Sequence, residues 1–382
     1  MGLAIGLMSG TSMDGIDVAL IETDGTALKL ARGGNGYVEA LGPTGYRPYS
    51  DEERALLRRA LVDAESVADR GDRPGCLPEA EAMITRAHAE AVETFLAAEK
   101  LGPADVEVIG FHGQTVLHRP SEGITLQIGD GPALAERIGI PVVYDMRAAD
   151  IAAGGQGAPL VPVFHRALAE ASGFSLPLAV LNIGGVANVT LIGADGSLLA
   201  FDTGPGNALI DDWMRERTGR ALDDGGRTAA RGRADGALLA WLLMHPFFVQ
   251  RPPKSLDRNW FSHKLAGQLS TEDGAATLTS FTAQAAARAL DHARETPERW
   301  IVAGGGARNG ELMRLLKHHL RVEIATADSV GWSSAFLEAQ AFAYLAVLSL
   351  RGESITFPTT TGVGRPITGG VLAGARGATS GS

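Results

Sequence analysis

The chain has 382 residues, of which 45% are hydrophobic and 20% are charged. This length suffices for two domains of ordinary size, and the composition excludes a largely disordered chain. The net charge of −10 argues against nucleic-acid binding, because neutralising phosphates requires clustered Lys and Arg.

The first predicted element is a hairpin with a turn rich in hydrogen-bond donors. Apolar runs at residues 3–7 and 16–21 predict two strands with a tight loop between them. Glycines let this loop approach a ligand closely, hydroxyls donate hydrogen bonds, and carboxylates suit the water shell of a metal ion. The residues concerned are Gly10, Thr11, Ser12, Asp14, Gly15 and Asp17. The pattern indicates half of a phosphate clamp, with an ordinary polar hairpin turn as the alternative.

Helix-like and strand-like segments then alternate, which predicts an α/β protein. The predicted strands are residues 106–111, 124–128, 142–144, 178–183, 186–192, 198–201 and 300–303. The predicted helices are residues 51–68, 78–98, 132–137, 158–169, 208–217, 234–243, 277–294, 309–320 and 333–350. We expect residues 219–232 to form a surface loop.

Two polar loops follow predicted strands in the first half of the chain. His112 and Gln114 follow the strand at 106–111 and are suited to bind sugar hydroxyls or phosphate. Arg147 follows another predicted strand, at 142–144, and is a candidate clamp for a carboxylate or phosphate, or else a surface partner of Asp150. The glycine-rich residues 154–157 are interpreted as a hinge between domains.

A second hairpin lies near the middle of the chain. Two apolar runs flank Gly184 and Gly185, as two runs flank the first glycine loop. This similarity suggests two related halves that face each other across a cleft. Asp202 follows the next strand, where a carboxylate can act as a general base, although an Asx turn is the alternative.

A third glycine cluster, Gly304, Gly305 and Gly306, joins a strand to a helix N-terminus, which suits an anionic or nucleotide group. The cluster does not match the dinucleotide fingerprint, and the chain has no P-loop. Residues 251–256 form a basic loop, interpreted either as a cover for a nucleotide or as a plain surface turn.

Cys76 is the only cysteine, which excludes an intramolecular disulfide and a cysteine-based zinc site. The histidines show no metal-ligand spacing. We expect neither a secretion signal nor a membrane span, and therefore a cytoplasmic protein that binds neither membranes nor nucleic acid.

Six ordered motifs resemble those of the anhydro-N-acetylmuramic acid kinases, within the sugar kinase, Hsp70 and actin superfamily. They are residues 6–17, 112–115, 153–162, 182–188, 201–207 and 253–255. The resemblance implies a two-lobed, actin-like (ribonuclease H-like) fold with ATP between the lobes. The implied domains are lobe I, residues 1–145 plus about 355–382, and lobe II, residues 146–354. It also implies that ATP and water convert 1,6-anhydro-N-acetylmuramic acid, an amino sugar of peptidoglycan recycling, to N-acetylmuramic acid 6-phosphate and ADP.

The resemblance further implies roles for individual residues. Asp202 would be the catalytic base, and Asp14 would hold Mg²⁺, through water. Substrate contacts would come from His112, Gln114, Arg147 and Glu338. The ATP-binding residues would be Gly10, Thr11, Ser12, Met13, Asp14, Gly15, Ile16, Asp17, Gly184, Gly185, Gly304, Gly305 and Gly306. Arg147 is followed by Ala148 and Ala149 where the family has a more basic stretch, which weakens its assignment as the carboxylate clamp.

Three other functions stay open from the sequence. One is a kinase of the same superfamily that acts on another sugar or polyol, and another is a nucleotide-switched scaffold like actin or Hsp70. A nicotinamide enzyme is the third and has only glycine-rich turns in its favour. A homodimer is compatible with all of them.

Overall fold

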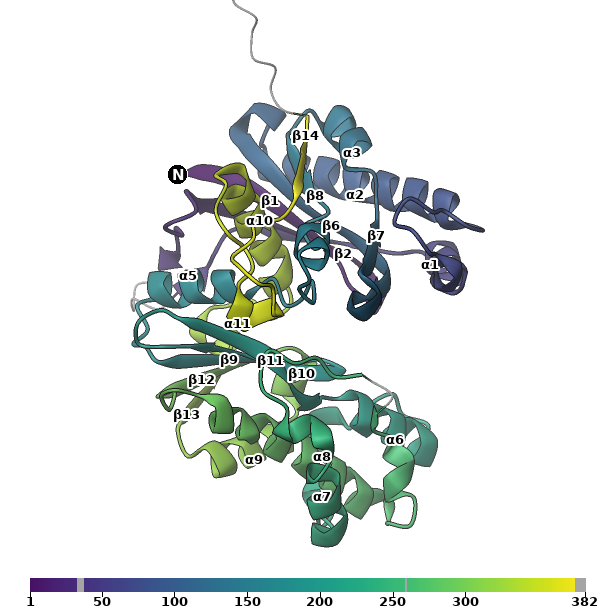
Figure 1. The fold of residues 1–382 in the computed structure, drawn as a ribbon, viewed down its shortest axis with the longest axis vertical. Coiled ribbons are helices and arrows are strands. Elements are labelled where there is room, and N and C mark those ends of the chain that lie inside the picture. The colour runs from purple at the N-terminus through teal and green to yellow at the C-terminus, as the bar shows by residue number, and fades with distance from the viewer. Residues whose placement is uncertain (33–37, 258–259, 375–382) are drawn as a thin grey trace, which may run out of the picture. The chain divides into compact units, whose positions relative to one another are not determined.

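The computed structural model describes residues 1–32, 38–257 and 260–374. The chain divides into two compact units: unit 1 comprises Met1–Ser172 and Ala335–Ser382, and unit 2 comprises Gly173–Ser334 (Figure 1). The boundaries expected from the sequence, 145/146 and about 354/355, differ from this division. The difference arises because α5 (Pro162–Ser172) packs on α10 (Leu337–Leu350), and α10 packs on the sheet of unit 1.

Unit 1 is built on a mixed seven-stranded sheet with the order β14-β8-β6-β1-β2-β5, to which β7 adds by pairing with β6. Strands β5, β2 and β1 are antiparallel neighbours, and β1, β6 and β8 are parallel neighbours. The strands are β1 (Gly2–Ser9), β2 (Gly15–Thr23), β5 (Thr44–Pro48), β6 (Val106–Arg119), β7 (Ile124–Ile128), β8 (Val142–Tyr144) and β14 (Val371–Ala373). A separate pair is formed by β3 (Ala31–Arg32) and β4 (Val38–Ala40).

Helices cover both faces of this sheet. Alternation along β1 directs Ile5 and Leu7 into a core shared with α1 (Asp51–Asp63) and α2 (Leu77–Glu99). On the other face, α10 lies across β1, β2 and β6 (Figure 1). Gly6 of β1 and Gly110 of β6 allow this close approach, because a Cβ atom at either position would overlap the α10 backbone. The remaining helices of unit 1 are α3 (Gly131–Ile138), α4 (Ala148–Ala152) and α11 (Pro358–Thr361).

Unit 2 contains a five-stranded sheet with the order β11-β10-β9-β12-β13. Its strands are β9 (Leu178–Ile183), β10 (Val186–Ile192), β11 (Leu198–Pro205), β12 (Arg299–Ala303) and β13 (Glu323–Thr326). The helices are α6 (Ala208–Thr218), α7 (Gly236–Leu243), α8 (Thr271–Ala287) and α9 (Gly310–Leu320). Apolar side chains of α8 and α9 pack on β9, β10 and β12, and a second core joins α6, α7 and α8.

The two units share one strand arrangement. The order β5-β2-β1-β6-β8 in unit 1 corresponds to β11-β10-β9-β12-β13 in unit 2, with three antiparallel strands followed by two parallel ones in each. Each unit begins with a hairpin whose turn contains glycine. This repetition confirms the predicted α/β, actin-like fold class and the two related halves.

One expectation about loops is confirmed with a refinement, and another is wrong. Residues 219–232 are mostly exposed, as expected of a surface loop, but they include the 3₁₀ helices η4 (Asp224–Gly226) and η5 (Ala229–Arg231) and bury Asp223 and Thr228. Residues 154–157 do not join the units, since the whole segment lies within unit 1. The buried carboxylate of Asp150 fixes this segment by accepting a hydrogen bond from the Gly157 amide at 2.7 Å.

Across the described parts of the chain, no helix combines the length and apolar character that crossing a membrane requires.

Candidate active site

The predicted phosphate loop of unit 1 connects β1 to β2 as a tight turn. The Met13 amide donates to the Gly10 carbonyl at 3.1 Å, and Met13 adopts a positive φ of 53°. Thr11, Ser12 and Asp14 are exposed on this turn, and the Ser12 hydroxyl donates to Asp14 at 2.7 Å. Ile16, by contrast, is buried in the core, so its side chain cannot contact a ligand. The turn thus presents small polar groups, as expected for binding phosphate.

Gln114 connects this turn to the neighbouring strand β6. Its side-chain oxygen accepts a hydrogen bond from the Ser9 hydroxyl at 2.5 Å, and its side-chain nitrogen donates to the Gly10 carbonyl at 3.2 Å. The Ser9 hydroxyl also contacts the Tyr49 hydroxyl at 2.8 Å. Gln114 is 1% exposed, so in this structure it supports the phosphate loop from the protein interior through its hydrogen bond to the Gly10 carbonyl. Sequence reasoning assigned no role to Ser9, although it lies within the 6–17 motif, and it missed Tyr49 because a lone Tyr outside any motif carries no local signal.

His112 holds Arg147 in a defined position. Arg147 donates to the His112 Nε2 atom from Nε at 3.3 Å and from Nη2 at 3.0 Å. Since Arg can only donate, Nε2 must be the acceptor, and Nδ1 carries the proton that binds the Gly113 carbonyl at 2.7 Å. Burial, followed by the charge of Arg147, lowers the pKa of His112 to about 3, which keeps the ring neutral. Both ring nitrogens are therefore occupied within the protein.

Arg147 itself is partly exposed and retains capacity for a ligand. Its Nη1 donates to the Gly157 carbonyl at 2.9 Å. Of its five N–H groups, contacts with described residues occupy three, so one on Nη1 and one on Nη2 remain available. Asp150 and Glu338 both attract the guanidinium electrostatically. The expected surface pairing with Asp150 is wrong, because Asp150 is 1% exposed and binds Gly157 and the Thr361 hydroxyl instead.

Acidic side chains gather near the phosphate loop. Burial raises the pKa of Asp17 to about 7, and the charges of Asp14 and Glu338 add to this effect. A divalent cation would relieve the repulsion among these three carboxylates. No group of three or more His, Cys, Asp or Glu among the described residues could hold a metal directly. A few carboxylates beside a phosphate-binding turn are the kind of donor set that suits a magnesium ion which keeps several water or phosphate ligands.

In unit 2, Asp202 lies inside β11, three residues before its end, and not in the loop after the strand as the sequence had suggested. A bulge at Ala187 and Asn188 disturbs the ladder beside it. One carboxylate oxygen accepts a hydrogen bond from the Leu256 amide at 2.8 Å. Burial raises the pKa of Asp202 to about 6, with the Leu256 amide opposing this shift. Such a carboxylate is ionised at neutral pH and still basic enough to accept a proton.

The two glycine clusters of unit 2 are held together by Asn207. Gly184 and Gly185 form the turn between β9 and β10, and their carbonyls accept hydrogen bonds from the start of α6, including the Asn207 amide at 2.7 Å. Gly304–Gly306 follows β12, with Gly304 at a φ of 78°. The Asn207 side chain donates to the Ile183 carbonyl at 3.1 Å and lies beside Gly305 and Gly306. Both clusters thus present backbone along one edge of the unit 2 sheet.

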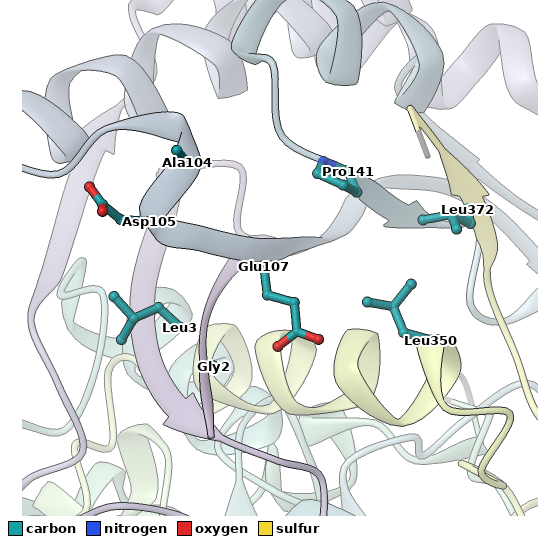
Figure 2. A pocket seen from close by; sticks show the side chains of 8 residues that line it. All are labelled: Gly2, Leu3, Ala104, Asp105, Glu107, Pro141, Leu350 and Leu372. Carbon is teal, nitrogen blue, oxygen red and sulfur yellow. The ribbon is translucent and has the colours of Figure 1, made fainter. Parts of the chain in front are cut away.

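Each unit contains a cavity, and only the cavity of unit 2 adjoins residues of the candidate site. A cavity of about 490 Å³ in unit 2 adjoins Gly185, Asp212, Leu256 and His263. A second cavity of about 400 Å³ in unit 1 lies between the start of β1 at Leu3, Glu107 of β6 and Leu350 at the end of α10 (Figure 2). The phosphate loop follows the carboxyl end of β1, where ligands bind in open α/β sheets. His112 and Gln114 lie within β6, which continues to Arg119, and not in a loop after a strand that ends at residue 111 as the sequence had suggested. Neither the phosphate loop nor His112 lines this cavity. The cavity of Figure 2 is therefore separate from the candidate site.

The chain was compared with solved structures. Component A of (R)-2-hydroxyglutaryl-CoA dehydratase from Acidaminococcus fermentans is 13% identical with a TM-score of 0.45, covering 91% of this chain and 99% of that chain. A glucokinase of the ROK family from Streptomyces griseus, solved with glucose and AMPPNP, is 16% identical with a TM-score of 0.41, covering 90% and 99%.

Comparison at the sequence level is more specific. The family model described as anhydro-N-acetylmuramic acid kinase matches residues 2–374. Proteins of that name from Methylobacterium nodulans and Methylorubrum populi are 70% and 64% identical to this chain, each covering 97% of it and 99% of the relative. The relative from Rhodopseudomonas palustris strain BisB18 is 55% identical over 97% of this chain and 99% of its own length. This chain therefore belongs to the anhydro-N-acetylmuramic acid kinase family.

Proposed function

We propose that the protein is an ATP-dependent kinase that opens 1,6-anhydro-N-acetylmuramic acid with water and phosphorylates O6. The products are N-acetylmuramic acid 6-phosphate and ADP, as in peptidoglycan recycling. The observation that carries the residue assignment is the partly buried Asp202 carboxylate, which the Leu256 amide holds and which is ionised at neutral pH. Family membership over residues 2–374 supports the substrate. A reaction that consumes ATP fits a cytoplasmic location.

In the proposed mechanism, Asp202 accepts a proton from a water molecule as the water oxygen bonds to the anomeric carbon of the sugar. The bond between that carbon and O6 breaks, and O6 then bonds to the γ-phosphorus as ADP leaves. Backbone amides of the turn between β1 and β2 and of Gly185 would stabilise the charge on the phosphates, whereas the Gly184 amide already donates to the Val186 carbonyl at 3.2 Å. Bound Mg²⁺, with Asp14 on its water shell, would neutralise charge on the transferred phosphoryl group. The glycines at 304–306 would lie against the adenosine.

The two available N–H groups of Arg147 suit the lactyl carboxylate of the sugar. His112 and Gln114 then contribute mainly by fixing Arg147 and the phosphate loop, respectively, since their polar atoms are engaged within the protein. Glu338 is exposed at the start of α10 and is suited to accept hydrogen bonds from sugar hydroxyls.

The assay that tests the function measures both chemical changes in one product. The protein is incubated with ATP, Mg²⁺ and the anhydro sugar, and the product is analysed by NMR for a free anomeric centre and a 6-phosphate. We expect both signals in equal amounts, with one ADP formed per sugar. Phosphate transfer to an ordinary hexose at a higher kcat/KM would favour the rival sugar kinase. ADP formation that the sugar does not accelerate would favour a nucleotide-switched scaffold.

The pKa of Asp202 predicts an acidic limit on turnover. Because burial raises this pKa to about 6, and the base must be ionised, kcat is expected to fall as the pH drops below about 6. Asp17, whose pKa is raised to about 7, titrates in a similar pH range, so its protonation is the competing explanation for a fall in kcat. Measuring kcat from pH 5 to 8 in an Asp17→Asn variant separates the two. If kcat of this variant still falls as the pH drops below about 6, the result supports Asp202 as the titrating group. If the fall in kcat disappears, the result contradicts this assignment.

Removing the acceptor at His112 is expected to weaken sugar binding. In a His112→Leu variant, Arg147 loses the Nε2 atom that binds two of its N–H groups, so its guanidinium is free to turn away from the substrate. We expect the KM for the sugar to rise about 10-fold, corresponding to the loss of a hydrogen bond to a charged group. His112→Gln, which keeps an acceptor, should show a smaller rise. An unchanged sugar KM in His112→Leu would contradict the role of Arg147.

A further inference from the structure

Lys254 is the basic residue of the loop at 251–256, and it is buried. Its exposed fraction is 7%, although a lysine between Pro253 and Ser255 is expected at the surface. The loop is therefore not a plain surface turn at this position. A buried cation is costly unless its surroundings stabilise it, so its contacts need an explanation.

The Lys254 ammonium is held by a carbonyl and two aromatic rings. Its Nζ donates to the Phe247 carbonyl at 3.0 Å. It lies 4.5 Å from the centroid of the Phe247 ring and 5.7 Å from that of Phe201, within the range of a cation–π interaction. Asp291 attracts it electrostatically, whereas burial and Arg288 lower its pKa to about 8, so it remains charged at neutral pH. These contacts fix the side chain inside unit 2.

The backbone around Lys254 holds Asp202 from two sides. The Lys254 carbonyl accepts a hydrogen bond from the Asp202 amide at 3.0 Å. Two residues further on, the Leu256 amide donates to the Asp202 carboxylate at 2.8 Å. Phe201, whose ring faces the ammonium, directly precedes Asp202. The side chain of Lys254 therefore anchors the segment that sets both the backbone and the carboxylate of Asp202.

We propose that Lys254 is a positioning residue for Asp202: its buried ammonium fixes the loop whose backbone orients the carboxylate toward the attacking water. The inference rests on the proposed role of Asp202 as the base. It assigns Lys254 no contact with ATP or the sugar. Loss of the ammonium should consequently slow the chemical step and leave ATP binding unchanged, since a small displacement of a catalytic group is enough to lower the rate.

The test compares Lys254→Met with Lys264→Met. Methionine keeps much of the apolar stem of lysine but has no cation, and Lys264 is an exposed lysine of the same unit, on η8 (His263–Ala266). We expect kcat to fall about 10- to 100-fold in Lys254→Met, with the dissociation constant for ATP within twofold of wild type. Lys264→Met should match wild type in both. Lys254→Arg, which keeps a cation able to reach the Phe247 carbonyl, should have a kcat above that of Lys254→Met.

A double variant separates positioning from general damage. Introducing Lys254→Met into an Asp202→Asn background should lower the residual rate no further, because there is no carboxylate left to orient. The inference would be overturned if the two substitutions lowered kcat independently, so that their effects multiply in the double variant. A wild-type kcat in Lys254→Met would also overturn it, as would equal losses of kcat and ATP affinity in both Lys254→Met and Lys254→Arg. High activity of Asp202→Asn alone would instead remove the base role itself, so the two failures are distinguishable.

Discussion

Replacing Asp202 with Asn is expected to lower kcat by about 10²- to 10⁴-fold, the range that a general base contributes. Asparagine has nearly the same shape and keeps an oxygen that can accept the Leu256 amide, so the local structure should survive. It cannot accept a proton from water at neutral pH, and ring opening should therefore stop. ATP binding, measured by isothermal titration calorimetry, should be unchanged because Asp202 is not assigned to the phosphates.

Asp211→Asn provides a matched control. Asp211 belongs to α6 in the same unit, and burial raises its pKa to about 6, as it does for Asp202. The two carboxyls thus have similarly raised pKa values, although Asp211 is also influenced by Arg215 and Asp212, and Asp211 has no proposed role in the reaction. We expect Asp211→Asn to keep kcat within about twofold of wild type. A kcat within tenfold of wild type in Asp202→Asn, or equal losses in the two variants, would contradict the base assignment.

Local sequence patterns predicted the elements whose geometry depends on neighbouring residues. The hairpin turns at residues 10–14 and at Gly184 and Gly185 were found because alternation of apolar runs and glycine is a short-range signal. The prediction of two related halves followed from comparing these hairpins, whereas the strand order of the two sheets did not. Family motifs then supplied the expected roles of Asp202 and Arg147, for which the residues alone left alternatives open.

Features that depend on distant parts of the chain could not be predicted. His112 accepts from Arg147, 35 positions away, and only the fold shows that both ring nitrogens are occupied. The burial of Lys254 depends on the rings of Phe201 and Phe247, which no pattern within its own loop indicates. The expected boundaries differ from the contact-based division for the same reason, since α10 returns to the sheet of unit 1 more than three hundred residues after β1.

Gly6→Ala is expected to destabilise unit 1 by about 1–3 kcal/mol, the usual cost of overpacking a close contact. A Cβ atom at Gly6 would overlap the carbonyl oxygen of Ala339 on α10, and backbone cannot move aside as a flexible side chain can. Gly364→Ala is the control within the same unit, because no atom lies within 4 Å of its added Cβ. It should leave stability nearly unchanged.

The distribution of aromatic residues allows this destabilisation to be located. All five Trp residues lie within Gly173–Ser334, which forms unit 2, so Trp fluorescence follows that unit, while far-ultraviolet circular dichroism follows both. In Gly6→Ala, we expect the circular dichroism transition in urea to begin at a lower concentration than the Trp transition. A curve that coincides with that of Gly364→Ala would show that α10 does not depend on Gly6 for its position. Because Glu338 is in the first turn of α10, loss of this packing should also raise the KM for the sugar, so that one methyl group added in β1 affects substrate binding.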